Sequence, residues 1–364
     1  MKHFTLLVAI IAVCFSVSLA AAQNKVVVIP LNSAKKLNNV VTVSATGGDY
    51  TDPVAAVNSI TDASAANPYL VLIGPGVYTL TQTLVMKPYV TVAGSGQGAT
   101  KLTGAISSSA ADENSALVSG ADNVVLGDLT IANTGGEYSI ALYNENASPD
   151  IRDVTVTAFG GSGSFGVCNS NSSPSMINVT ATASGGTQSY GVYNISSSPC
   201  MTNVTATGNA SGGTLSIGVF NVNSSPSMTN VTATASGGEH NRGVNNGGDS
   251  SPIMTNVTAT ASGGVESNGV YNSNSSPSMT NVTATASMGT ENYGVRNISS
   301  TATITTIRHC TLSGTTDGIY HDGGTTRVMQ SSIIHGVTNI SGTLTCVTSD
   351  NGFATDLGID CLSL

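Results

Sequence analysis

Residues 224–238 read SSPSMTNVTATASGG, and this stretch decides the fold because the chain repeats it. Near-copies begin at Ser172, Ser197, Ser250 and Ser275, and each is followed by a segment similar to GVYN. A repeat at this spacing is typical of solenoid proteins, in which each unit buries its apolar face only against its neighbours. The repeat therefore predicts one elongated all-β body rather than two globular domains.

The central valine of the motif marks the period along the chain. Its positions are Val154, Val179, Val204, Val231, Val257 and Val282, with Leu129 before them and Ile307 expected after them. The steps between these positions are 25, 25, 25, 27, 26, 25 and 25 residues. With coils ~4.8 Å apart, about ten coils would form a rod about 50 Å long.

Apolar and polar residues alternate within one unit as they do in a half-buried strand. We expect Val179, Ala181 and Ala183 to point inward, and Thr180 and Thr182 to point outward. The GVYN segment is expected to form another strand, with its valine inward and its tyrosine outward. Since further turns separate these strands, each unit contains three strands and three turns. This predicts one coil of a right-handed parallel β-helix.

A bend is expected between the first two strands of each unit. Met176 lies three residues before Val179, which breaks the alternation, and Asn178 occupies the break. Asparagine tolerates the left-handed backbone conformation that a tight bend needs. The equivalent residues are therefore expected to stack as a ladder: Asn178, Asn203, Asn230, Asn256 and Asn281.

The first residues have the pattern of a secretory signal peptide. Lys2 and His3 precede an apolar run at 4–19, and small residues at 20–22 offer a cleavage site. A membrane helix is the alternative, but the run is short for one. We therefore expect export to the extracellular space or cell surface.

A formal charge of -9 with only 9% charged residues makes nucleic acid or an anionic membrane a poor partner.

The start of the exported chain is expected to close one end of the solenoid. Asp52 and Pro53 form an N-cap and first-turn pair, which predicts a short capping helix at roughly residues 53–63. The expected domains are a signal peptide at 1–22, a leading segment at 23–46, the parallel β-helix at 47–342 and a C-terminal cap at 343–364.

Five of the six cysteines lie beyond the expected signal peptide. Cys346 and Cys361 are close in sequence near the end of the chain and are expected to form a disulfide in an oxidising compartment. Cys168 is interpreted as the occupant of the position that Tyr193 holds one repeat later, which makes a bond to Cys200 improbable.

Three segments near the N-terminus carry a family resemblance. GDYTDPVAAVNSI at 48–60, LIGPGVYTL at 72–80 and KPYVTVAGSGQGATKLTG at 87–104 resemble the opening of pectinesterases and of the wider pectin-lyase-like superfamily. The repeats that follow are similar to generic right-handed parallel β-helix repeats of bacterial secreted proteins. The resemblance covers roughly residues 47–342. It implies the fold, while the superfamily includes lyases, hydrolases, esterases and non-enzymatic adhesins.

The catalytic motifs of pectinesterases are not found in this sequence. Their QDT, DFIFG and Gly-Arg-Pro-Trp segments have no counterpart, and the chain contains no tryptophan. We therefore predict no catalytic residue, no metal ligand and no cofactor, and lean against enzymatic activity. Asp128 and Asp153 would stack one coil apart and could bind a cation, but the simpler interpretation is that aspartate replaces asparagine at the same bend.

A second charged cluster is expected near the C-terminus. It consists of Arg308, His309, Asp317, His321, Asp322 and Arg327. Acid–base chemistry is conceivable there. The cluster lies where the repeats lose regularity, and a polar capping coil accounts for it equally well.

Threonines recur two apart on the outward side of successive strands. Their candidate binding positions are Thr180, Thr182, Thr205, Thr207, Thr232, Thr234, Thr258, Thr260, Thr283 and Thr285, with Thr155 and Thr157 before them. Positions two apart on a strand are separated by ~6.7 Å and coils by ~4.8 Å, which predicts a flat, regular grid of hydroxyls and methyls. Such a grid resembles the ice-binding face of solenoid antifreeze proteins. The alternative is that threonine simply suits an exposed strand face and was copied when the repeat was duplicated.

A second outward ladder follows the tyrosine of GVYN. It contains Tyr143, Cys168, Tyr193, Phe220, Asn245, Tyr271, Arg296 and Tyr320. Exposed aromatic rings on a regular face can stack on sugar rings or pack against a partner surface. The five aromatic residues are therefore candidate carbohydrate-binding residues, although a purely structural stack is the simpler alternative.

Three hypotheses follow from the sequence. The leading one is a secreted, non-catalytic β-helix that acts as a surface or adhesive scaffold and binds polysaccharide or cell-surface glycan. The second is an enzyme that acts on polysaccharide, similar to pectin lyases or pectinesterases. The third is ice binding through the threonine grid.

Overall fold

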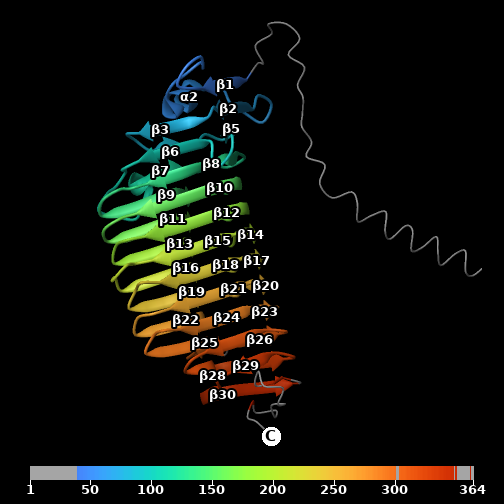
Figure 1. The fold of residues 1–364 in the computed structure, drawn as a ribbon. Coiled ribbons are helices and arrows are strands. Elements are labelled where there is room, and N and C mark those ends of the chain that lie inside the picture. The colour runs from blue at the N-terminus through green and yellow to red at the C-terminus, as the bar shows by residue number, and fades with distance from the viewer. Residues whose placement is uncertain (1–38, 301–302, 348, 351–360, 362–364) are drawn as a thin grey trace, which may run out of the picture. The chain divides into compact units, whose positions relative to one another are not determined.

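A computed structural model describes residues 39–300, 303–347, 349–350 and 361 of the chain. The expected signal peptide, the leading segment up to residue 38 and most of the expected C-terminal cap lie outside the described residues. The described part is wound into about eleven stacked coils of parallel strands, with few helical residues (Figure 1). The predicted right-handed parallel β-helix is therefore confirmed.

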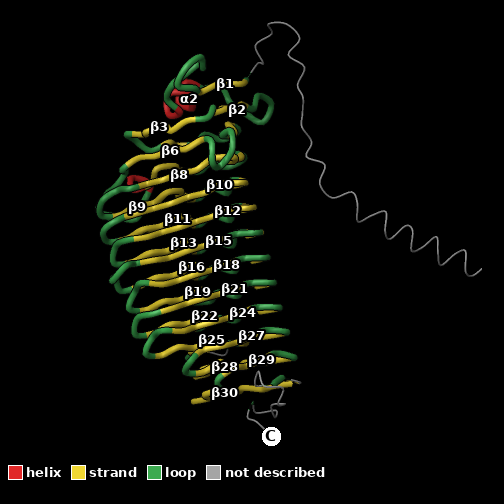
Figure 2. The backbone as a smooth tube through the Cα atoms, in the orientation of Figure 1, coloured by secondary structure: helices red, strands yellow, loops and turns green. Residues whose placement is uncertain are grey.

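Each coil contributes strands to three parallel ladders, joined by loops and turns (Figure 2). The first, the methionine ladder, contains β1 (Val40–Val43), β2 (Tyr69–Ile73), β5 (Val90–Ala93), β14 (Cys200–Thr202), β17 (Ser227–Thr229), β20 (Ile253–Thr255), β23 (Ser278–Thr280) and β26 (Ile304–Arg308). The second, the threonine ladder, contains β3 (Gly76–Leu80), β6 (Thr100–Gly104), β15 (Thr205–Asn209), β18 (Thr232–Ser236), β21 (Thr258–Ser262), β24 (Thr283–Ser287), β27 (Thr311–Gly314) and β29 (Ser332–Ile334).

The third ladder carries the aromatic side chains. It contains β4 (Leu84–Val85), β7 (Ala116–Ser119), β9 (Tyr138–Glu145), β11 (Gly163–Ser170), β13 (Gln188–Ile195), β16 (Leu215–Val222), β19 (His240–Gly247), β22 (Glu266–Ser273) and β25 (Glu291–Ile298). Five longer strands join two ladders around a bend: β8 (Val125–Asn133), β10 (Asp150–Phe159), β12 (Ser175–Ser184), β28 (Asp317–Met329) and β30 (Val337–Val347).

The core consists of apolar columns, one from each ladder. Met176, Met201 and Met228 are fully buried and in register on one side of the coil. Val179 of the next ladder and Val192 of the third are also buried, as predicted. Each coil contributes few apolar side chains, so stability accumulates along the stack rather than in one central core.

One predicted member of the valine column is wrong. Ile307 pairs with Met279 and so continues the methionine column, whereas Thr283 pairs with Thr311, which aligns Cys310 with Val282. The turn between β25 and β26 has three extra residues, which displace the register after residue 298. Spacing alone assigned Ile307 to the wrong ladder because the insertion precedes it.

The bends behave as the asparagine pattern predicts. Asn178, Asn203, Asn230, Asn256 and Asn281 have φ angles of 53–54°. Each amide beyond the first donates to the side-chain oxygen of its predecessor over 3.0–3.2 Å. These residues form the exposed asparagine ladder. A hydrogen bond over 3.0 Å from the Asn178 amide to Asp153 begins it, and Asp128 and Asp153 occupy equivalent bends at φ 56° and 53°.

A short helix, α2 (Pro53–Ser59), lies at the N-terminal end of the coils (Figure 1). The Asp52 carboxylate accepts hydrogen bonds from the backbone N–H groups of Val54 and Ala55, which confirms the predicted N-cap. The helix ends earlier than the predicted residue 63 because Ile60 is already extended. None of the described helices is long and apolar enough to cross a membrane.

Candidate functional site

The aromatic face is the outward surface of the third ladder, over strands β9 to β28. Strand pairing aligns the predicted column from Tyr143 through Tyr193 and Phe220 to Tyr320 in consecutive register. The face is therefore continuous from coil to coil, as the sequence predicts.

This column is less exposed than predicted. Tyr143 is only 5% exposed and Cys168 only 3%, while Tyr193 and Phe220 are half-buried. A second outward column, which the sequence reasoning missed, lies beside the first and covers part of it. Its members are Ile140, Phe165, Tyr190, Ile217, Arg242, Asn268, Tyr293 and Asp317.

The rings of the two columns pack against one another. Phe165 and Tyr190 stack with their centroids 5.0 Å apart, and Tyr190 lies 5.0 Å from Tyr193. Tyr193 and Phe220 are 5.2 Å apart. Such contacts are worth about 0.5–1.5 kcal/mol per pair beyond the burial of area, so the rings hold each other in fixed positions. Fixed rings are suited to binding because little side-chain entropy remains to be lost.

A hollow of about 280 Å³ opens among these rings, and we call it the aromatic hollow. Its lining residues are Ala111, Tyr138, Tyr143, Phe165, Cys168, Ser170, Gln188, Tyr190, Tyr193 and Ile195. The Tyr190 hydroxyl donates to the Gln188 side-chain oxygen over 3.0 Å. The lining thus combines apolar ring surfaces with a few polar groups, which is the usual composition of a small-ligand site.

Four titratable groups in the hollow are held in their protonated forms. Burial raises the pKa of Cys168 and of Tyr193 to about 12, and raises the pKa values of Tyr143 and Tyr190 still further. The carboxylate of Glu145 adds to the rise at Cys168 and Tyr143. At neutral pH these groups therefore donate hydrogen bonds and do not act as bases or nucleophiles.

Farther along the aromatic face, an ionic cluster replaces the packed rings. The Arg242 guanidinium lies 3.8 Å above the centre of the Tyr271 ring, and Arg296 lies 5.1 Å from the ring centres of both Tyr293 and Tyr320. Glu266 forms an ion pair with Arg296, and its nearest oxygen is 3.9 Å from Arg242. The two arginines lower the pKa of Glu266 against the opposing effect of burial.

A buried asparagine ladder runs beneath the aromatic face. Its members are Asn144, Asn169, Asn194, Asn221, Asn246, Asn272 and Asn297. Each side-chain amide donates to the next oxygen over 2.7–2.9 Å, always in the same direction. Asn297 donates to the Thr326 hydroxyl, which lies 3.2 Å from Nδ1 of His321. The sequence signal for this ladder was the last letter of GVYN, which repeats from Asn144 to Asn297 and is replaced by His321 in the next coil.

The predicted charged cluster near the C-terminus is dispersed. His309 occupies a bend at φ 51°, in line with the exposed asparagine ladder, whereas His321 is fully buried at the end of the other ladder. Asp317 accepts from the Thr338 hydroxyl over 2.9 Å, and Asp322 accepts from Ser341 over 2.7 Å. His321, Asp317 and Asp322 thus have separate hydrogen-bond partners, and His309 lies on a different ladder from His321.

The threonines predicted to form a grid do align. Strand pairing places Thr180 beside Thr205 and Thr182 beside Thr207, and the same register continues to β24. Strand β10 extends the alignment through Thr155 and Thr157. We call these two aligned rows the threonine array. The outer row, to which Thr180 and Thr205 belong, is exposed from Thr180 onward. The inner row, to which Thr182 and Thr207 belong, is half-buried.

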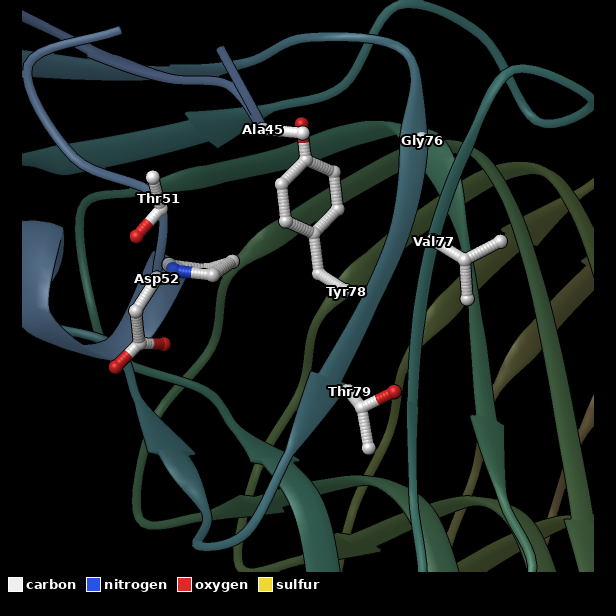
Figure 3. A pocket seen from close by; sticks show the side chains of 8 residues that line it. Ala45, Thr51, Asp52, Gly76, Val77, Tyr78 and Thr79 are labelled. Atoms are coloured by element: carbon white, nitrogen blue, oxygen red, sulfur yellow. The ribbon is translucent and has the colours of Figure 1, made fainter.

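The segments with the pectinesterase resemblance meet at the N-terminal end of the coils. A hollow of about 370 Å³ lies here. Figure 3 shows residues that border it, among them Thr51, Asp52 and the segment 76–79. The Tyr78 side chain extends toward Ala45, and its hydroxyl donates to the Gly74 carbonyl over 3.0 Å. The Asp52 carboxylate already caps helix α2. The residues that resemble pectinesterases therefore form the N-terminal end of the β-helix and support the helix that lies there.

Except for Cys168, which lines the aromatic hollow, the remaining candidate groups lie elsewhere. Cys346 and Cys361 form a disulfide, while Cys168, Cys200 and Cys310 are free thiols. Arg152 pairs with Asp150 over 3.0 Å. Within the part of the chain that the structure describes, no group of three or more His, Cys, Asp or Glu side chains is arranged to hold a metal ion.

Comparison with known proteins identifies the fold. No protein-family model and no curated protein sequence matches the chain. A variant of the catalytic domain of a GH87 α-1,3-glucanase, in complex with nigerose, has a TM-score of 0.52 at 13% sequence identity. Another variant of that domain, in complex with tetrasaccharides, has a TM-score of 0.50 at 14% identity. Each match covers 89% of this chain and 71% of the glucanase chain. The fold implied by the pectin-lyase-like resemblance is thus present.

Proposed function

We propose that this β-helix binds a polysaccharide chain against its aromatic face and does not cleave it. The observation that carries the proposal is the aromatic hollow, in which Tyr138, Phe165, Tyr190 and Tyr193 border one concave surface. Aromatic rings present flat apolar surfaces that match the C–H faces of sugar rings, and tyrosine adds a polar group at the ring edge. Gln188 and Ser170 supply further polar contacts for sugar hydroxyls.

The dimensions of the face favour a chain over a single sugar. The column from Tyr143 through Cys168 and Tyr193 to Phe220 spans three steps between coils. At ~4.8 Å per step these residues extend over about 14 Å. An elongated ligand can contact several coils in succession, and each coil offers the same backbone geometry. A repeating polymer therefore fits this face better than an isolated monosaccharide.

The composition of the hollow supports binding without cleavage. Hydrolysis of a glycosidic bond generally requires two carboxyl groups on opposite sides of the bond. The lining residues include neither a carboxylate nor an imidazole. Glu145 is the one carboxylate that perturbs the pKa values of both Cys168 and Tyr143. The lining of the hollow therefore offers no second carboxyl group that could act together with Glu145.

The solved structures with the same fold suggest the first ligand to test. The GH87 α-1,3-glucanase domains are bound to nigerose or to tetrasaccharides. An insoluble α-1,3-glucan is therefore the first probe, followed by pectin and alginate. Export of the chain is proposed from the signal-peptide pattern at residues 1–22, and an adhesive role is proposed from the repeated outward face. Export is tested by N-terminal sequencing of protein recovered from the culture medium, which should begin near Gln23.

Retention on these polysaccharides tests the proposal directly. We expect the wild-type chain to be retained on at least one of them, and the double variant Tyr190→Ala/Tyr193→Ala to be retained much less. The matched control is Thr182→Ala/Thr207→Ala, which removes two side chains from another face and should bind like wild type. Failure of all three polysaccharides to retain the wild type, or equal retention of both double variants, would contradict the proposal.

A parallel incubation tests the absence of cleavage. The wild-type chain should release no new reducing ends, unsaturated products or methanol from any of the three polysaccharides. Release of any of these products would replace the non-catalytic proposal with the enzymatic alternative.

A further inference from the structure

The threonine array combines two kinds of regularity. Along each strand, two outward threonines are separated by one inward alanine or valine, so the hydroxyl-bearing side chains project to the same side. Across the strands, the outer row contains Thr130, Thr155, Thr180, Thr205, Thr232, Thr258, Thr283 and Thr311 in unbroken register. The expected spacings are ~6.7 Å along a strand and ~4.8 Å between coils. The array is therefore a two-dimensional grid.

The grid is uncharged and faces outward. On the threonine ladder from Thr180 to Ser287, the outward strand positions are filled by Thr, Ser and Asn alone. Among the residues that the structure describes, the threonine hydroxyls of both rows from β10 to β24 have no hydrogen-bond partner within the protein, whereas Thr130 at the start of the outer row donates to the Gln97 carbonyl over 2.7 Å. From β10 to β24 each hydroxyl is thus available to water or to a ligand, and each methyl group lies beside it.

The other outward columns of the same coils vary. The column that contains Tyr193 also contains Cys168, Phe220, Asn245 and Arg296. On the methionine ladder, one outward column has Ser175, Cys200, Ser227, Ile253 and Ser278 in successive coils. The fold therefore accepts varied side chains at outward strand positions.

The threonines differ from these columns because neither row changes between β10 and β24. A left-handed backbone accounts for the constant asparagines, but threonine at these extended positions has no such requirement. β-propensity favours β-branched and aromatic residues in general, and so does not select threonine alone at twelve positions of two rows. The uniformity of the array points to a ligand that is itself regular.

We propose that the threonine array binds ice. The outward threonines of a parallel ladder stand side by side and do not enclose a small molecule, and an uncharged face has no complementarity to a polyanion. Apart from the exposed Phe159 at the end of β10, the threonine ladder carries no aromatic ring from β10 to β24, and the aromatic hollow lies on a different ladder. Ice is an uncharged lattice of water whose oxygens repeat at intervals of several ångströms and exchange hydrogen bonds with hydroxyls. Regularly spaced hydroxyls can form hydrogen bonds to rows of water molecules whose spacing matches such a lattice. The methyl groups beside them restrict the positions and orientations of those water molecules.

Ice partitioning of the full chain tests this proposal independently of polysaccharide binding. Wild-type protein should be enriched in slowly grown polycrystalline ice and should slow ice recrystallisation. Thr232→Lys and Thr232→Tyr both project beyond the plane of the grid, and tyrosine also keeps a high strand propensity. Both variants should reduce the enrichment at least several-fold. The control is Ser227→Lys, an exposed position of the same coil on the methionine ladder, and it should match wild type.

Each other outcome overturns the proposal. Absence of wild-type enrichment would exclude ice as the ligand, and an equal loss in Ser227→Lys would show that the effect does not come from the array. Circular dichroism should show the same strand content in all variants, and retained enrichment in a folded Thr232→Tyr would also contradict the proposal. The wild type could also self-associate without being enriched in ice. If Thr232→Lys abolished that self-association, the face would be assigned to a second copy of this chain.

Discussion

Substitution of Asn221 tests whether the buried asparagine ladder stabilises the coils. Asn221 is fully buried, accepts from the Asn194 amide over 2.9 Å and donates to the Asn246 oxygen over 2.8 Å. In Asn221→Ala the amide of Asn194 loses its acceptor and the oxygen of Asn246 loses its donor. Each buried, unsatisfied polar group costs about 1–3 kcal/mol, so the free energy of unfolding should fall by about 2–6 kcal/mol.

The exposed asparagine ladder supplies a matched control with the same chemistry. Asn230 makes the same two kinds of side-chain hydrogen bond, but water can replace its partners. Asn230→Gly should be nearly neutral, because glycine accepts the φ of 54° at no steric cost. Asn230→Ala should cost about 1–2 kcal/mol, which is the penalty for a left-handed residue with a Cβ atom.

Urea denaturation followed by circular dichroism measures these differences, and hydrogen exchange of peptides from the coils around residues 194–246 localises them. Local measurement is needed because a solenoid can open coil by coil. Our reasoning predicts faster exchange near Asn221→Ala and little change near Asn230→Gly. Equal losses at the two ladders, or a loss below about 1 kcal/mol in Asn221→Ala, would refute the claim that burial makes this ladder stabilising.

Three further predictions concern other parts of the fold. Gly218→Ala should destabilise by about 1–3 kcal/mol in urea denaturation, because a Cβ there would lie 2.6 Å from the Gly243 carbonyl oxygen of the next coil; an unchanged midpoint would contradict this close approach. Burial lowers the pKa of His321, so the unfolded chain binds the proton more readily, and stability present above about pH 6.5 should decline as the pH falls below that value. His321→Gln should flatten this dependence in melts between pH 7 and 5, and an identical pH profile would exclude His321 as its source. Cys346→Ser should lower the free energy of unfolding by about 2–3 kcal/mol, because it removes a crosslink between residues 15 apart in sequence. The loss should appear as faster hydrogen exchange in β30, and an exchange rate in β30 equal to that of the wild type would contradict the prediction.

The repeat predicted the coil architecture because each inward column has one simple requirement. Methionine and valine fill the core, and asparagine adopts the left-handed bend, so their spacing is visible in the letters. The displaced position of Ile307 could not be predicted, because a three-residue insertion in a turn leaves no apolar signal. Register after such an insertion is set by strand pairing, which the structure resolves.

The second aromatic column was missed for a different reason. Alternation assumes that outward residues lie two apart, whereas Tyr190 and Tyr193 lie three apart and share one face. Gly191 interrupts the pairing between them, and a Cβ at that position would approach the Thr207 backbone nitrogen to 2.6 Å. The glycine permits a local break in alternation that turns both tyrosines outward. The aromatic hollow depends on this break.

Polysaccharide retention of the wild-type chain and of Tyr190→Ala/Tyr193→Ala is the most direct test of the proposed function. The two rings border the same hollow, and the threonine array lies on a different ladder. Binding by the aromatic face predicts retention of wild type on α-1,3-glucan, pectin or alginate and its loss in the double variant. Undiminished retention of a folded Tyr190→Ala/Tyr193→Ala, or no retention of wild type on any of the three, would contradict it.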